Sequence, residues 1–306
     1  MAKKVLVTGS NGLLGQKLVQ LLTEDENYQL IATARGANRL PENKGYTYVS
    51  MDITSEGQVT KVISQHKPDF IIHTAAMTNV DQCETEKEAC WQQNVDAVKY
   101  ITNAAAKNGS FLIHVSTDFI FDGKDGPYDE KAKGNPLSYY GESKLAAEKI
   151  VTKSKIKWAI ARTVLVYGIA HDMSRSNIIL WVKKSLEEGR TINVVNDQFR
   201  SPTLAEDLAM GCYLIMENEA TGIFNISGKE LLTPYDMAIK TADFFKLDKK
   251  LITKTDSTKF KQPAVRPLRT GFIIDKAIKE LGYDPHSFEE GISLLAEQIA
   301  DANPAK

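Results

Sequence analysis

Three glycines near the N-terminus constrain the fold of this chain more than any other feature. Gly9, Gly12 and Gly15 follow the apolar run Lys4–Thr8, which is typical of a buried strand, and precede an amphipathic segment ending at about Leu22. In a strand–turn–helix unit, the first glycine allows a tight turn, the second lets backbone N–H groups approach a pyrophosphate, and the third lets helix and strand pack closely. The motif predicts a dinucleotide-binding turn, and a purely structural turn is the alternative. Its candidate cofactor-binding residues are Gly9, Asn11, Gly12, Leu13, Leu14 and Gly15.

Four further apolar runs, over residues 29–34, 46–51, 69–76 and 111–115, alternate with helical signals, one of which covers 86–109 around Asn94. This alternation predicts an α/β fold with a Rossmann-type, doubly wound parallel sheet covered on both faces. Ligands of such sheets bind beyond the carboxyl ends of the strands. The candidate cofactor-binding residues at those ends are Arg35, Asp52, Ile53, Ala75, Ala76, Thr78 and Ser116.

The residue that ends the second strand bears on the choice of cofactor. A cofactor without a 2′-phosphate usually meets an acid there, but this chain has Arg35, with Arg39 nearby. A guanidinium forks well onto a phosphate, so NADP(H) is preferred over NAD(H), with a solvated basic loop as the alternative. Asp52 is placed to accept from an adenine amino group or to cap the following helix, and His73 is interpreted as a hydrogen-bonded core histidine.

A tyrosine and a lysine four residues apart mark a candidate catalytic helix. Pro136 and the N-cap candidate Ser138 precede strong helix formers, so Tyr140 and Lys144 are expected on one helix face. A fixed ammonium beside a phenol favours the phenolate and lowers the phenol pKa, which would make Tyr140 a general acid/base. The same spacing also occurs on ordinary surface helices.

The regular alternation stops after Gly168. Residues 1–168 with about 203–230 are predicted to form the NADP-binding domain, and about 169–202 with 231–306 a smaller, discontinuous α+β substrate-binding lobe. The local signals predict helices over 177–188, 203–218 and from about 288, a helix start at Thr233-Pro234, strands over 191–195 and 222–226 (the latter returning to the main sheet), and a solvated surface over 248–261.

The composition favours a cytoplasmic enzyme or binding protein. A formal net charge of −1 gives no reason to expect nucleic-acid or membrane binding, and there is no secretory signal or apolar run of about 18 residues. Three cysteines, Cys83, Cys90 and Cys212, argue against a disulfide framework and are expected as buried free thiols. No residue is assigned to a metal. A homodimer is left open.

Several motifs taken together resemble one family. The glycine motif Thr8–Gly15, Ser116-Thr117-Asp118 at the end of the fifth strand and Tyr140 with Lys144 resemble an extended short-chain dehydrogenase/reductase. Within that group, the chain is most similar to the dTDP-4-dehydrorhamnose reductase, or sugar-nucleotide-binding, family. The similarity covers about residues 4–230 and includes Ala75–Asp81, Asn94-Val95, Phe119–Gly123, Arg162–Gly168 and Ser201–Ala209.

This resemblance implies NADPH-dependent reduction of the 4-keto group of a nucleotide-linked deoxyhexose, as in dTDP-rhamnose biosynthesis. It implies that Tyr140 delivers a proton to the carbonyl oxygen, that Lys144 holds the nicotinamide ribose, and that Thr117 orients the carbonyl. The backbone after Thr163 would meet the nicotinamide amide. The implied substrate contacts are Thr117, Asp118, Phe119, Leu165 and Arg200.

Two departures from the family pattern leave the substrate open. Leu165 stands where rhamnose-pathway reductases typically have a tryptophan, and the approach to Pro202-Thr203, which typically has a glycine, reads Phe199-Arg200-Ser201 in this chain. Arg200, Arg266 and Arg269 are candidate diphosphate contacts, with ordinary surface arginines as the alternative. Two other functions remain open: a non-catalytic, NADP-binding regulatory subunit like that of methionine adenosyltransferase, and a sugar-nucleotide epimerase or dehydratase.

Overall fold

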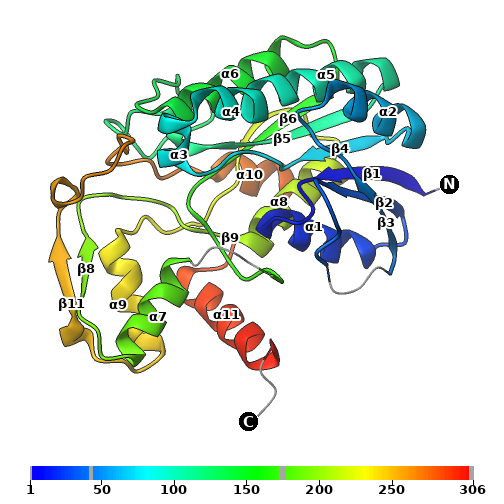
Figure 1. The fold of residues 1–306 in the computed structure, drawn as a ribbon. Coiled ribbons are helices and arrows are strands. Elements are labelled where there is room, and N and C mark those ends of the chain that lie inside the picture. The colour runs from blue at the N-terminus through cyan, green and yellow to red at the C-terminus, as the bar shows by residue number, and fades with distance from the viewer. Residues whose placement is uncertain (1, 41–43, 173–176, 303–306) are drawn as a thin grey trace.

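The computed structural model describes residues 2–40, 44–172 and 177–302, and its centre is a seven-stranded sheet (Figure 1). The strand order is β10-β6-β5-β4-β1-β2-β3, and every neighbouring pair is parallel. The predicted doubly wound parallel sheet is therefore confirmed, as is the return of the strand over 222–226 to it. The strands are β1 (Lys3–Thr8), β2 (Tyr28–Ala34), β3 (Tyr46–Ser50), β4 (Phe70–His73), β5 (Phe111–Thr117), β6 (Trp158–Thr163) and β10 (Gly222–Asn225).

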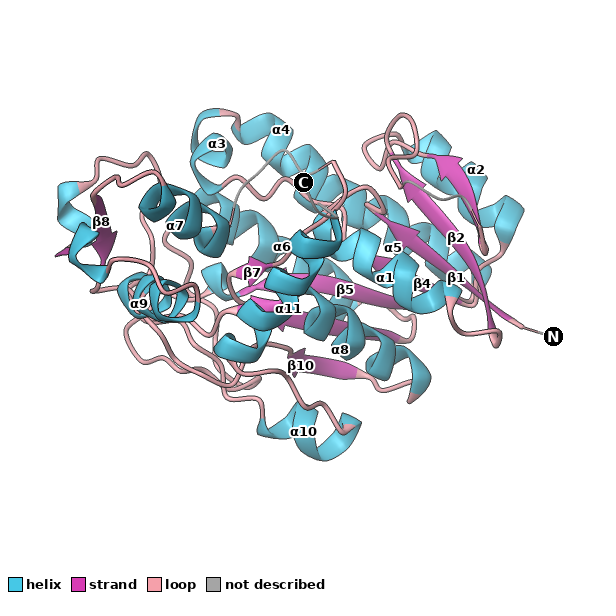
Figure 2. Cartoon of the chain, turned by 90° about the horizontal axis from the view of Figure 1, so that it is seen from below, coloured by secondary structure: helices cyan, strands magenta, loops and turns pink. Residues whose placement is uncertain are grey.

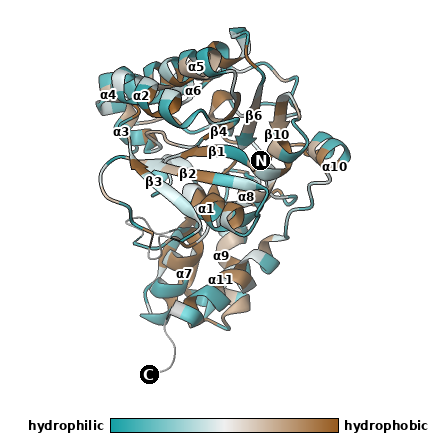
Figure 3. Ribbon diagram, turned by 90° about the vertical axis from the view of Figure 1, so that its right-hand side faces the viewer, coloured by the Kyte–Doolittle hydropathy of each residue, from teal (hydrophilic) through white to brown (hydrophobic). Residues whose placement is uncertain are grey.

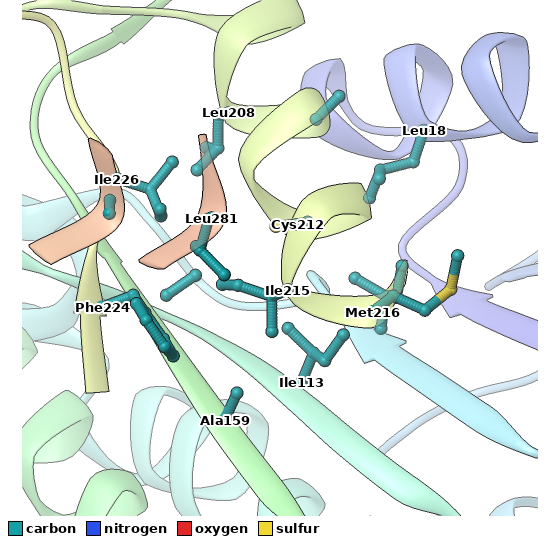
Figure 4. Packing of buried hydrophobic residues seen from close by; sticks show 14 of the residues in the cluster. Leu18, Ile113, Ala159, Leu208, Cys212, Ile215, Met216, Phe224, Ile226 and Leu281 are labelled. Atoms are coloured by element: carbon teal, nitrogen blue, oxygen red, sulfur yellow. The ribbon is translucent and has the colours of Figure 1, made fainter. Parts of the chain in front are cut away.

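Helices cover both faces of this sheet because its strands are apolar on both sides. One face packs against α1 (Leu13–Thr23), α8 (Ala205–Glu217) and α10 (Asp275–Leu281). The other packs against α2 (Glu56–His66), α5 (Ala97–Asn108) and α6 (Tyr139–Lys153). Figure 2 shows α1 and α8 lying over the strands, and Figure 4 shows residues of α8 packed with Ile113 of β5 and Phe224 of β10.

The segment before β5 is less regular than the helical pattern predicts. It contains α3 (Val80–Thr85), which the sequence did not indicate, and α4 (Lys87–Trp91), followed by a π-helical turn over Gln92–Asp96 that leads into α5. A π-turn inserts an extra residue into the helix and so changes the direction of its side chains. Here it places Asn94 inside the protein.

A smaller lobe lies beyond the carboxyl end of the sheet (Figure 1). Its helices α7 (Ile178–Glu187) and α9 (Pro234–Phe244) enclose an apolar cluster with the two-stranded parallel sheet of β8 (Ile192–Val195) and β11 (Ile252–Thr255). Figure 3 shows the hydrophobic residues of α7 in this lobe. Helix α9 begins as predicted, because Thr233 forms a capping box with Asp236.

The remaining elements connect the lobe to the sheet. Helix α11 (Phe288–Ala302) packs on the lobe through Phe288, Ile292 and Leu295. No helix among the described residues is long and apolar enough to cross a membrane. The short elements are β7 (Val166–Tyr167), paired with β9 (Thr203–Leu204), and 3-10 turns over Asp118–Ile120, Lys249–Leu251 and Ser257–Lys259.

Three local predictions are corrected by the structure. The helix predicted from Thr203 begins at Ala205, because Thr203 first pairs in β9. The charged run 248–261 is not only solvated surface, since Ile252 of β11 is buried in the lobe. Residues 272–283 were assigned to the lobe, but Phe272 and Tyr283 pack in the main core. The division into two domains otherwise stays a proposal.

Candidate functional site

The glycine turn has the geometry of an anion site. Gly9 has a φ of +71°, and a Cβ there would lie 2.9 Å from the backbone of Ala75, while a Cβ on Gly15 would lie 2.2 Å from the Gly9 carbonyl oxygen. Gly12 caps α1 without a side-chain hydrogen bond, and the first turn of α1 holds no acid. Backbone N–H groups at the start of α1 are thus suited to a phosphate, so the turn fits the predicted dinucleotide.

Asn11 positions the loop that follows β2. Its Nδ2 donates to the Ala37 carbonyl across 2.9 Å, and its Oδ1 accepts from the Arg39 N–H across 3.0 Å. The glycine turn and the basic loop are therefore held together, which the sequence did not reveal. Arg35 and Arg39 are both exposed, and neither forms an ion pair within the described ranges.

Asp52 has a local structural role at the end of β3. Its Oδ1 accepts from the N–H and the hydroxyl of Thr54, at 2.9 and 2.7 Å. Helix α2 is capped by Ser55, which accepts from Gln58, so the alternative that Asp52 caps this helix is wrong. The predicted adenine contact of Asp52, next to the half-buried Ile53, stays a prediction.

Asn94 connects the loop after β4 to the candidate catalytic helix. Its amide accepts from the Met77 N–H across 2.8 Å and donates to the Met77 carbonyl across 3.1 Å, between the predicted cofactor residues Ala76 and Thr78. It also donates to the Ser143 hydroxyl of α6 across 3.0 Å. The sequence placed Asn94 in a helix and in a segment that carries the family resemblance, but gave it no role; a polar residue in an otherwise apolar helix face was the available signal.

The interpretation of His73 as a core residue is confirmed. Its Nδ1 lies 2.7 Å from the Thr8 hydroxyl, and its ring stacks on His114 with centroids 5.5 Å apart. Burial lowers the pKa of His73 to about 3 and that of His114 well below its ordinary value, so both rings are neutral. The three cysteines are also buried and free, as predicted.

Helix α6 begins at the predicted cap and carries Tyr140 to the end of β5. The Ser138 hydroxyl accepts from the Gly141 N–H across 3.2 Å, and the Thr117 hydroxyl lowers the pKa of the Tyr140 phenol, against the larger effect of burial. The ring of Phe119 meets that of Tyr140 edge-on, with centroids 5.7 Å apart. A Cβ on Gly141 would lie 2.2 Å from the Phe119 carbonyl oxygen, so this glycine, which the sequence did not single out, allows the approach.

The predicted effect of Lys144 on the Tyr140 phenol is wrong for this structure. Burial raises the pKa of Tyr140, because a phenolate loses its hydration there, and the Thr117 hydroxyl opposes this shift. The Lys144 Nζ instead donates to the Val115 carbonyl across 2.7 Å and lies 3.5 Å from the His114 Nε2. Burial lowers the pKa of Lys144 to about 8.

Asp118 and Arg200 lie beside Thr117 but are enclosed by protein. Asp118 is 2% exposed, and burial raises the pKa of its carboxyl. Arg200 is 5% exposed; its guanidinium donates to the carbonyls of Phe199, Pro267 and Leu268 and to the Gln198 side chain, and its Nε lies 3.8 Å from Asp118. Arg200 is therefore not a surface arginine, and that alternative is wrong. Its guanidinium is also not exposed, as the predicted contact with a diphosphate would require.

The other predicted residues differ in how they are held. Leu165 is 43% exposed and has a φ of +39°, so it presents an apolar side chain at a strained position. The Thr163 hydroxyl donates to Thr203, and the buried Ser116 hydroxyl has no partner among the described residues. Such an orphaned hydroxyl is suited to a bound ligand. Arg266 forks onto Asp81, and the Arg269 guanidinium lies over the Phe199 ring.

Comparisons with known proteins agree with this architecture. The sequence pattern of the family described as RmlD substrate binding domain matches residues 3–300. The dTDP-4-dehydrorhamnose reductase of Aggregatibacter actinomycetemcomitans is 29% identical over 94% of this chain and 97% of its own. Methionine adenosyltransferase 2 subunit beta of Danio rerio is 32% identical over 80% of this chain and 75% of its own.

A solved structure shares the same fold. The dTDP-4-dehydrorhamnose reductase of Bacillus anthracis in complex with NADP superposes with a TM-score of 0.83 at 26% identity, over 97% of this chain and 100% of that one. The chain therefore belongs to the RmlD substrate-binding family of extended short-chain dehydrogenase/reductases. It is an NAD(P)-dependent oxidoreductase of the dTDP-4-dehydrorhamnose reductase-like type.

Proposed function

We propose that this protein uses NADPH to reduce the 4-keto group of a nucleotide-linked deoxyhexose. The observation that carries this proposal is that α6 brings Tyr140 to the carboxyl end of β5, where its ring packs edge-on against Phe119 and its phenol is influenced by the Thr117 hydroxyl. The glycine turn after β1 lies at the same edge of the parallel sheet. A proton donor and a dinucleotide-binding turn at one sheet edge are what carbonyl reduction requires.

Each residue of the site has a role that its surroundings support. When bound, a reduced nicotinamide supplies the hydride that adds to the carbonyl carbon. The protonated phenol of Tyr140 delivers a proton to the carbonyl oxygen, and burial favours this form because it raises the pKa of Tyr140. The Lys144 ammonium, fixed by the Val115 carbonyl, holds the ribose hydroxyls. Phe119 and Leu165 contact the hexose.

The preference for NADPH rests on Arg35 and Arg39. Both are exposed beyond β2, next to the glycine turn, where a 2′-phosphate would lie. We expect NADPH to bind more tightly than NADH, and Arg35→Gln to reduce the affinity for NADPH alone by about tenfold or more. The control is Lys61→Gln on the exposed side of α2. Equal dissociation constants for NADPH and NADH would contradict this preference.

The most direct test of the reaction is a substrate panel. Purified protein with NADPH and 4-keto-6-deoxyhexoses linked to dTDP, GDP or CDP should oxidise NADPH with at least one sugar, followed by its absorbance. Absence of turnover with every sugar, together with tight cofactor binding, would favour a regulatory subunit. The relative from Danio rerio supports that second candidate. An epimerase or dehydratase is less favoured, because Asp118, the acid that follows Thr117, is enclosed by protein.

A further inference from the structure

The carboxylate of Asp118 has a protein partner on each oxygen. Its Oδ1 lies 3.1 Å from the Thr117 hydroxyl, and its Oδ2 accepts from the Thr270 hydroxyl. The Arg200 Nε lies 3.8 Å from Oδ2. Because both oxygens are engaged inside the protein, Asp118 has no side open to a sugar.

The Thr117 hydroxyl has one proton and two groups that compete for it. Its oxygen accepts from the Phe119 N–H across 3.3 Å, and its proton is directed at the Asp118 carboxylate. The Thr117 hydroxyl also acts on Tyr140, where it opposes the rise in the pKa of the phenol, and the Tyr140 ring packs against Phe119, the residue after Asp118. Once Tyr140 has given its proton away, the phenolate competes with Asp118 for the Thr117 proton.

Arg200 and Thr270 decide how strongly Asp118 holds that proton. Both come from segments outside the sheet: Arg200 precedes β9, and Thr270 lies between β11 and α10. A carboxylate that is already hydrogen-bonded and charge-compensated can release the Thr117 hydroxyl at a smaller cost. The Thr270 hydroxyl is fully buried, so no water replaces it.

We propose that Asp118 is a positioning residue that, with Arg200 and Thr270, controls the direction of the Thr117 hydroxyl, and that it is not a substrate contact. Its part in turnover rests on the proposed function, whereas the hydroxyl direction does not. The other charged groups that act on this network are Asp197 and Arg266, through Arg200, and the titratable thiols of Cys83 and Cys90 pack in one cluster with Tyr140.

The experiment is an ultraviolet titration of the Tyr140 phenol, taken as the difference between each variant and the same variant carrying Tyr140→Phe. Thr270→Val should move the titration to higher pH although it changes no charge, because Asp118 then holds the Thr117 proton more firmly. Arg200→Met should move it in the same direction, with Arg200→Lys close to the parent. Asp118→Asn should move it to lower pH. Arg190→Met, an exposed arginine whose partner is Glu188, is the control.

Kinetics add a second readout. With an active substrate, Thr270→Val should lower kcat about tenfold, the rate equivalent of one hydrogen bond, and leave KM unchanged. The proposal would be overturned if the Tyr140 phenol titrated at the same pH in the parent, in Thr270→Val and in Asp118→Asn. A raised KM with unchanged kcat in Asp118→Asn would make Asp118 a substrate contact instead. If Arg200→Met does not fold, Thr270→Val and Arg200→Lys still decide the question, and the titration needs no substrate.

Discussion

The Asn94 amide donates to the Ser143 hydroxyl across 3.0 Å and thereby joins the loop after β4 to the candidate catalytic helix α6. The same side chain pairs with both polar groups of the Met77 backbone. A single residue on a π-turn therefore aligns a predicted cofactor loop with the helix that carries Tyr140 and Lys144.

Replacing this amide should cost stability. Asn94→Leu leaves the N–H and carbonyl of Met77 and the Ser143 hydroxyl short of a partner inside the protein. We expect the free energy of unfolding to fall by about 2 kcal/mol or more, measured by denaturant unfolding. Asn103→Leu, on the exposed side of α5, should change it by less than about 0.5 kcal/mol. Equal stability of the two variants would refute the role given to Asn94.

A buried ion pair fixes α6 against the sheet. The Arg162 guanidinium of β6 donates to both carboxylate oxygens of Glu148, at 3.0 and 2.8 Å, with both side chains buried. Glu148→Gln should lower the free energy of unfolding by about 3–5 kcal/mol, because it leaves the guanidinium without a counter-charge. The double variant Glu148→Met, Arg162→Met should be more stable than Glu148→Gln. The opposite order would show that the pair itself provides the stability.

Two glycines offer a matched test of packing. Gly141→Ala should destabilise the protein and lower activity, because the new methyl would lie 2.2 Å from the Phe119 carbonyl oxygen unless the backbone moves. Gly57→Ala, in α2, adds a methyl in open space and should stabilise the protein by up to about 1 kcal/mol. Thermal unfolding of both variants measures the contrast. A Gly141→Ala variant as stable as the parent would show that α6 can move away from Phe119.

Much of the fold followed from residue patterns that act locally. Apolar β-branched runs, the glycine turn and caps such as Ser138 and Thr233 depend on nearby residues, and the structure has them where predicted. Ile252 and Tyr283 were misassigned, because their burial depends on partners far away in the sequence. Ile252 lies in a charged run that indicated solvated surface, and Tyr283 lies in the C-terminal part of the chain that was assigned to the lobe.

The chemistry of the site was less predictable, because it depends on burial. Residue types correctly indicated Tyr140, Lys144 and Thr117 as neighbours of one sheet end, but not the direction of each hydrogen bond. The Lys144 ammonium points to the Val115 carbonyl, and burial reverses the expected shift in the pKa of Tyr140. Arg200 resembled a surface anion contact, since no local pattern reveals that it faces Asp118.

The buried ammonium of Lys144 should reduce the stability of the folded protein. Burial lowers its pKa to about 8, below the value of about 10.4 expected in the unfolded chain, so between these pH values the unfolded state binds more protons. The loss of stability caused by burying the Lys144 charge is therefore full below pH ~8 and disappears as pH rises towards ~10.4. Lys144→Met should raise the free energy of unfolding by about 2 kcal/mol at pH 7 and abolish turnover.

Denaturant unfolding of Lys144→Met and the parent at several pH values measures this difference. The difference in free energy of unfolding between the two proteins should become smaller as the pH rises. A gap that widens with pH would contradict the assignment of a depressed pKa to Lys144.

The measurement that tests the central claim most directly is turnover of the Tyr140→Phe variant. With NADPH and the best sugar of the panel, this variant should reduce the substrate about two to four orders of magnitude more slowly than the parent, because it lacks the proton donor. Its dissociation constant for NADPH should change little. Turnover close to that of the parent would show that Tyr140 is not the acid and would contradict the proposed reaction at this site.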